Sequence, residues 1–166
     1  MKQSLANINK VVGHCSFTSP RMDIGLKEIK QWHTLPKMPP EVKRAIEIGR
    51  LPKSEAAKWG NGWNDVGYHY IIRRNGDIEK GRELTEVPAA NGAGNNTNTI
   101  TWCYAGGMSA DKTRSEDNRT PEQRSAIYVL KNMISVTLGR QVEWVGHRDL
   151  PGVTKDCPGF DVKTQL

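Results

Sequence analysis

One long amphipathic segment between two apolar stretches limits the folds open to this chain. Residues 120–139, TPEQRSAIYVLKNMISVTLG, carry the start and stop residues of a helix: Thr120, Pro121, Gln123 and Gly139. Apolar residues recur in it at helical spacing: Ile127, Leu130, Ile134 and Leu138. The segment therefore predicts a helix with one buried face, and the apolar stretches at 99–107 and 141–147 predict strands beside it.

The rest of the chain adds elements of both kinds. A strand is expected at 8–16, a helix at 23–33, and a hairpin at 67–82 with Asn75-Gly76 as a two-residue type I′ turn. This mixture predicts an α/β fold, with a single mixed central sheet flanked by helices. Residues 35–62 differ, since four prolines (Pro36, Pro39, Pro40 and Pro52) interrupt two short helical pieces. We interpret this segment as an inserted helical excursion within one domain spanning 1–166.

Composition narrows the function classes. The net charge is +6 in 166 residues, but the basic residues are spread out, so no specific nucleic-acid binding is expected. Attraction to anionic polymers and a merely solvated basic surface both fit this charge. No apolar run is long enough to cross a membrane, and MKQSLANINK does not resemble a signal peptide, which predicts synthesis in the cytoplasm.

Histidines end two of the predicted strands, and a cysteine follows in a loop. His14 closes the first strand, His147 closes the last, and Cys157 lies ten residues further on in HRDLPGVTKDCPGF. If the two strands are neighbours, both imidazoles meet at one rim, and a set of two nitrogens and one sulfur favours zinc. A purely structural role for these histidines is the alternative. Alternation along the strand sends Cys15 to the opposite face from His14, so the two should not serve one site.

Four motifs resemble a known family. The chain resembles zinc-dependent N-acetylmuramoyl-L-alanine amidases of the bacteriophage lysozyme (endolysin) type. The motifs that carry this resemblance are, in order, GHCSFT, EIKQWH, GWNDVGYHYIIRRNGDIEKGR and GHRDLPGVTKDCPGF. These enzymes share a fold with peptidoglycan recognition proteins. The resemblance implies one Zn²⁺ per chain, bound by His14, His147 and Cys157. It also implies catalytic roles for Tyr68, in GYH, and Lys155, two positions before the cysteine.

The resemblance also implies the reaction and its setting. A metal-activated water would hydrolyse the amide between N-acetylmuramic acid and L-alanine in peptidoglycan, for lysis of a phage host. We expect a monomer that stays in the host cytoplasm and reaches the wall after membrane permeabilisation. The alternatives are a non-catalytic peptidoglycan-binding module and an additional regulatory role in binding a viral RNA polymerase.

Other polar residues receive weaker assignments. Asn91 and Asn95 follow the hairpin, where family members contact ligand, and are predicted substrate contacts. Many relatives carry a glutamate base on the central strand, but Cys103 falls there in this chain, so we assign no carboxylate base and interpret Cys103 as a packed thiol. His33 and His69 are expected to be structural. The excursion at 35–62 has no counterpart in the shorter lysozymes, and we consider it either a wall of the substrate groove or a surface decoration.

Overall fold

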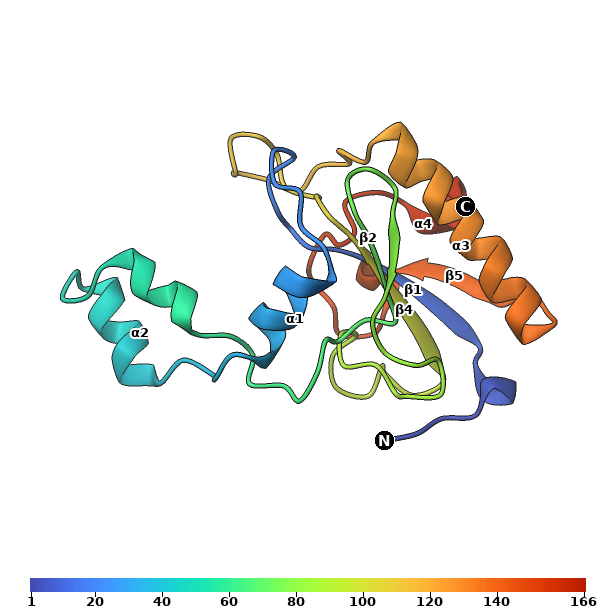
Figure 1. Ribbon diagram of the computed structural model, residues 1–166, viewed down its shortest axis with the longest axis horizontal. Coiled ribbons are helices and arrows are strands. Elements are labelled where there is room, and N and C mark those ends of the chain that lie inside the picture. The colour runs from blue at the N-terminus through green and yellow to red at the C-terminus, as the bar shows by residue number, and fades with distance from the viewer.

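A five-stranded mixed sheet runs through the centre of the protein. The computed structural model describes residues 1–166, with strands β1 (Lys10–Cys15), β2 (Tyr70–Ile72), β3 (Ile78–Lys80), β4 (Thr99–Tyr104) and β5 (Glu143–Gly146). Their order across the sheet is β3-β2-β4-β1-β5, and only the β2–β3 pair is antiparallel. The predicted single mixed sheet flanked by helices is confirmed (Figure 1).

Helix α3 (Pro121–Leu138) covers one face of this sheet and has the predicted ends. The Thr120 hydroxyl accepts a hydrogen bond from the Gln123 N–H, and the Gln123 side chain accepts one from the Thr120 N–H. Gly139 ends the helix in the left-handed conformation, with φ of 65°. These local contacts satisfy backbone groups that the helix itself leaves unpaired.

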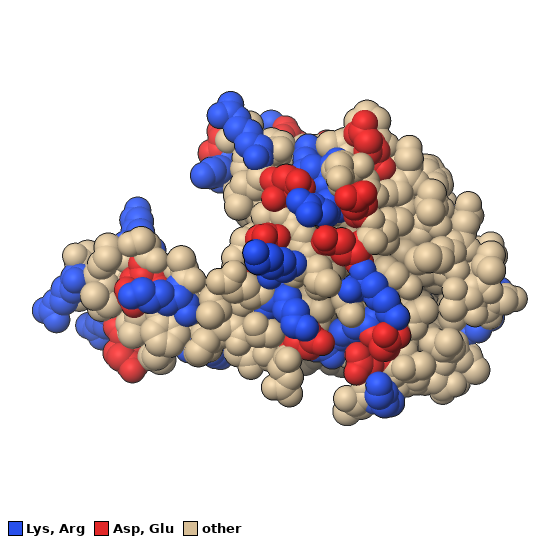
Figure 2. All heavy atoms as spheres, in the orientation of Figure 1, with Lys and Arg blue, Asp and Glu red and all other residues tan.

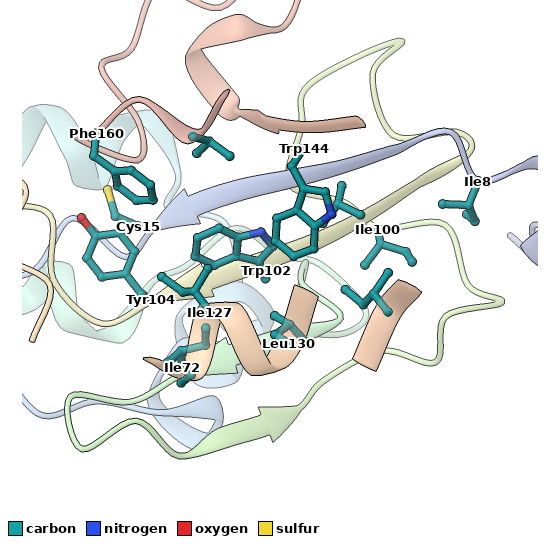
Figure 3. Close-up of a cluster of buried hydrophobic side chains, with 14 residues drawn as sticks. Ile8, Cys15, Ile72, Ile100, Trp102, Tyr104, Ile127, Leu130, Trp144 and Phe160 are labelled. Carbon is teal, nitrogen blue, oxygen red and sulfur yellow. The ribbon is translucent and has the colours of Figure 1, made fainter. Parts of the chain in front are cut away.

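The largest core cluster lies between α3 and the sheet. Trp102 and Tyr104 of β4 are fully buried, and Trp144 of β5 and Phe160 pack beside them (Figure 3). Aromatic side chains bury large apolar areas, so this layer dominates the hydrophobic stabilisation of the fold. The Tyr104 hydroxyl donates to the Pro158 carbonyl at 2.7 Å, which ties the loop after Cys157 to the core.

Helix α1 (Leu26–Thr34) packs on the opposite face of the sheet. It starts three residues later than the prediction, because Gly25 is its N-cap and the Glu28 carboxylate accepts the Gly25 N–H at 2.9 Å. Ile29 and His33 are its buried residues. A short C-terminal helix, α4 (Val162–Gln165), was not predicted.

The excursion at 35–62 extends away from the sheet (Figure 1). It contains α2 (Pro40–Glu47) and the 3₁₀ helix η2 (Lys53–Lys58), and neither helix contains a buried residue. Backbone hydrogen bonds from Gly60 to Pro36 and from Asn61 to Trp32 close its base. The body of the excursion is thus held by few contacts to the rest of the fold.

The turn between β2 and β3 differs from the prediction. A type I′ turn needs positive φ at both Asn75 and Gly76, but only Gly76 has one, at 88°. The Gly76 N–H donates to Arg73, and the Asn75 side chain accepts the Asp77 N–H at 3.1 Å. The local Asn75 side-chain contact therefore stabilises a longer loop than the two-residue turn that we predicted.

Charged side chains are mixed over the visible surface. Figure 2 shows Lys and Arg interspersed with Asp and Glu on this face, and basic side chains on the excursion. No continuous basic stripe crosses this face, as the spacing of the basic residues predicted. None of the helices has the length and apolar character needed to span a membrane.

Gly13 makes a close contact that a side chain would disrupt. A Cβ at this position would lie 2.6 Å from Cζ2 of the fully buried Trp102. We expect Gly13→Ala to reduce the free energy of unfolding by about 1–3 kcal/mol, because the indole cannot move freely. Urea unfolding measures this loss. The substitution Trp102→Phe removes the obstructing ring atoms. The double variant Gly13→Ala/Trp102→Phe should therefore be more stable than the sum of the two single effects predicts. Strict additivity would contradict the steric explanation.

Candidate active site

The ends of β1 and β5 bring two histidines together. The strands are parallel neighbours with Gly13 opposite Gly146, so His14 and His147 occupy adjacent positions at the same rim of the sheet. Their rings lie 4.4 Å apart between centroids. Because η3 (His147–Asp149) starts at this point, the chain turns and returns Cys157 to the same rim.

His14, His147 and Cys157 form a set of possible metal ligands. Each offers one ligand atom, and these three atoms lie within 4.8 Å of one another. His14 Nε2 is 2.8 Å from the Asn91 Oδ1, while its Nδ1 is 3.9 Å from the Cys157 Sγ. Nδ1 is therefore the His14 atom available to a metal, and the donor set of two nitrogens and one sulfur fits zinc.

The protonation states suit this donor set. Burial and the neighbouring His147 lower the pKa of His14 to about 3, and burial followed by the Lys155 charge lowers the pKa of His147. Both imidazoles are therefore neutral at neutral pH, the form that binds metals. The neighbouring Cys15 thiol and burial raise the pKa of Cys157, and a bound cation would favour its thiolate.

Asn91 is fully buried and is a hydrogen-bond partner of the His14 ring. Besides its bond with His14, its side-chain amide donates to the Asn95 carbonyl and the Thr99 hydroxyl, each at 3.0 Å. The sequence predicted Asn91 as a substrate contact. It lines the groove around the ligands, and its side-chain hydrogen bonds go to the protein and hold His14 in place. Asn95, the other predicted contact, is half-buried and donates to the Pro151 carbonyl at 3.1 Å.

Cys15 contacts the site from the far side of β1. Alternation does place it in the α3-facing core, opposite His14, yet its Sγ is 3.9 Å from the Cys157 Sγ (Figure 3 shows Cys15 beside Tyr104 and Phe160). Its backbone N–H also donates to that sulfur at 3.4 Å. Cys15 and His14 therefore lie on opposite faces of β1, as alternation predicted, and Cys15 is not among the three possible ligands. Its contact with Cys157 was not predicted, because Cys157 enters from a loop at the strand end, where both faces of β1 are within reach.

A groove of about 1130 Å³ surrounds these residues. Tyr68 lies in it, with its ring 5.2 Å from that of His14, and Lys155 lines it close enough for its charge to affect both histidines. Burial raises the pKa of Tyr68 well above its ordinary value, so its hydroxyl stays protonated. The groove thus places one hydroxyl donor and one ammonium beside the candidate ligands.

The residues interpreted as structural are buried or packed. Cys103 is fully buried on β4 and packs among apolar side chains. His33 accepts the Gly67 N–H at 2.9 Å and stacks near Trp63, although it also lines the groove. Of the excursion at 35–62, only Asn61 lines the groove, so α2 and η2 do not form its wall.

His69 makes the fold sensitive to acid. Its Nδ1 accepts the Thr101 N–H and its Nε2 donates to the Glu86 carbonyl, each at 2.9 Å, and burial lowers its pKa from 6.5 to about 4. Between these pH values the unfolded chain binds a proton that the folded protein does not. The stability contribution is therefore complete above pH 6.5 and is lost as the pH falls toward 4, at up to about 1.4 kcal/mol per pH unit.

This dependence is measurable by urea unfolding of metal-free protein between pH 7 and pH 4. His69→Gln keeps one acceptor and one donor but does not titrate, so we expect a less stable protein whose stability falls less steeply with decreasing pH. His14 and His33 contribute to the remaining slope, since burial also lowers their pKa values. An unchanged slope in the variant would contradict the assignment.

Comparisons with known proteins identify the family of this chain. The model of the N-acetylmuramoyl-L-alanine amidase family matches residues 5–160. The endolysin of Enterobacteria phage K11 is 34% identical over 150 residues, which cover 90% of this chain and 80% of the relative. The endolysin of Escherichia phage T7 is 33% identical over 150 residues, with the same coverage of 90% and 80%.

Solved structures share the fold at lower identity. The N-acetylmuramoyl-L-alanine amidase LysC from Clostridium intestinale URNW superposes with a TM-score of 0.59 at 20% identity, covering 99% of this chain and 86% of that one. The ectodomain complex of the peptidoglycan recognition proteins LCa and LCx gives 0.61 at 19% identity, with coverage of 99% and 82%. With the family match spanning residues 5–160, the chain belongs to the N-acetylmuramoyl-L-alanine amidases, enzymes that hydrolyse the amide between N-acetylmuramic acid and L-alanine in peptidoglycan.

Proposed function

We propose that this amidase is zinc-dependent and that His14, His147 and Cys157 hold one Zn²⁺ per chain. The observation that carries the proposal is the convergence of three ligand atoms within 4.8 Å at the rim of the sheet. Catalytic zinc sites use three protein ligands and leave a fourth position for water. A bound zinc ion supplies a water of lowered pKa, near 7, and polarises the scissile carbonyl.

The surrounding residues support this role by fixing the ligands. Asn91 accepts the Nε2 proton of His14, so Nδ1 carries the lone pair that faces Cys157. Such partners of metal-bound histidines set the tautomer and the ring orientation. The backbone N–H of Cys15 donates to the Cys157 Sγ, which favours the thiolate over the thiol.

Tyr68 and Lys155 are the proposed catalytic residues. The protonated Tyr68 hydroxyl can hold the attacking water by a hydrogen bond and help to pass a proton to the leaving amine. The Lys155 ammonium can stabilise the negative charge that develops on the carbonyl oxygen. Asn95, which lies in the loop beside them, is proposed as a substrate contact at the edge of the groove.

We further propose that the protein is a phage endolysin, which lyses the host as a monomer with residues 1–166 acting as one catalytic domain. The support is that the matched curated relatives are endolysins of phages K11 and T7. In this role the enzyme accumulates in the host cytoplasm and reaches the wall once the inner membrane is permeabilised. Expression in bacteria should therefore cause lysis only when a membrane-permeabilising agent is added.

Product analysis tests the reaction. Digestion of purified peptidoglycan should release new L-alanine amino termini, and the number of reducing sugar ends should stay constant. Treatment with a metal chelator should stop the release, and added Zn²⁺ should restore it. New reducing ends would make the enzyme a glycosidase, and wall binding without cleavage would favour the non-catalytic binding module.

A further inference from the structure

Phe17 combines two features that rarely occur together. It has a positive φ of 52°, and its side chain remains 50% exposed although it is a large hydrophobic residue. A positive φ places the Cβ of a bulky residue in a crowded position, and such strain concentrates at functional sites. Only two other non-glycine residues share this conformation: Asn98, a type that tolerates it well, and Lys112 in an exposed loop.

The neighbours of Phe17 hold it in this conformation. The Ser16 N–H donates to Tyr104 at 2.9 Å and the Thr18 N–H to Gly106 at 3.0 Å, while the two hydroxyls of Ser16 and Thr18 are 2.8 Å apart. These contacts fix the chain on both sides of Phe17 and do not involve its ring. A glycine or asparagine could adopt the same backbone with less strain.

The ring of Phe17 also lies outside the apolar core. It belongs to none of the three apolar clusters of the core. Instead it lines the groove that holds His14 and Cys157, three residues along the chain from His14. Exposed apolar side chains within a groove mark contacts with a ligand.

The chemistry around the scissile amide indicates which part of the substrate this ring contacts. On one side of that amide lies L-alanine, whose side chain is a single methyl group. On the other lies the muramic acid pyranose, whose C–H face is a broad apolar surface that complements the negative face of an aromatic ring. Resting on the proposed function, we propose that Phe17 is a substrate-binding residue that stacks against a sugar ring of the glycan strand.

The backbone strain allows a test that separates folding from substrate binding. Removing the strained side chain should not lower the thermal stability of the protein, but it should weaken substrate binding. In Phe17→Asn and Phe17→Gly, we expect a thermal midpoint equal to or above that of the wild type, an unchanged metal content, and a KM for soluble muropeptide raised about five- to tenfold. Lys112→Gly is the matched control, because it relieves a similar strain at an exposed position outside the groove. It should match the stability effect and leave KM unchanged.

Competitive inhibition of muropeptide cleavage shows whether Phe17 contacts the sugar part or the peptide part of the substrate. The inhibition constant of the peptide-free disaccharide, N-acetylglucosaminyl-N-acetylmuramic acid, should rise in Phe17→Asn about as much as KM, and that of the free stem peptide should not change. A rise for the stem peptide alone, or an unchanged KM in both variants, would overturn the proposal. Failure of the proposed function is distinct, since the wild type would then release no L-alanine amino termini.

Discussion

Replacing Cys157 with alanine should remove both the bound metal and the activity. The thiol is the only sulfur donor in the ligand set, and two imidazoles alone leave the site one protein ligand short. Changing residues that merely support metal ligands costs 10–100-fold in affinity or activity, so loss of the ligand itself should exceed about 100-fold. Elemental analysis of the purified variant and the rate of release of L-alanine amino termini measure the two effects.

A second cysteine provides the control for this variant. Cys103 is fully buried on the neighbouring strand β4, outside the ligand set, so Cys103→Ala should keep its metal and most of its activity. It should lose some stability, because the truncated side chain leaves a cavity in the core. A Cys157→Ala protein that retains both metal and turnover would exclude this ligand set.

The second large effect is expected at Lys155. Its ammonium lines the groove, and its charge lowers the pKa values of His147 and His14, so it lies close to the histidines where we propose that the scissile carbonyl binds. Removing a donor that stabilises an oxyanion costs about 10²–10³ in kcat. We therefore expect Lys155→Met to lower kcat by about this factor while the metal content stays unchanged.

Two further readouts separate catalysis from structure at this position. Lys155→Arg keeps the positive charge and should restore part of the lost kcat. In metal-free Lys155→Met, the pKa of His147 should rise, because the neighbouring cation that lowers it is gone. A Lys155→Met enzyme with normal kcat would contradict the proposed role, and loss of metal would make Lys155 a structural residue.

Local patterns in the sequence predicted much of the fold. The capping residues and apolar spacing of residues 120–139 identified α3 to within one residue at each end, because these signals act within a few residues. Histidines at two strand ends predicted the shared rim, since β1 and β5 are indeed neighbours. The predicted hairpin turn was wrong because the hydrogen bond that the Asp77 N–H donates to the Asn75 side chain outweighed the dipeptide preference.

Contacts that depend on the return of a loop could not be predicted. The Cys15–Cys157 contact joins residues 142 positions apart, and alternation along a single strand argued against it. The support that Asn91 gives to His14 likewise joins residues 77 positions apart and depends on how the loop at 91–98 folds. The strain at Phe17 leaves no trace in composition or spacing, because neighbouring backbone hydrogen bonds impose it.

We propose that His14, His147 and Cys157 bind a catalytic metal through two nitrogens and one sulfur. The most direct measurement is titration of metal-free wild-type protein with Co²⁺, followed by visible spectroscopy and by assays of amide cleavage during the same titration. We expect saturation at one ion per chain, absorption typical of tetrahedral cobalt with a thiolate ligand, and activity that rises in proportion to binding. Full cleavage by the metal-free protein, or binding without a thiolate band, would contradict it.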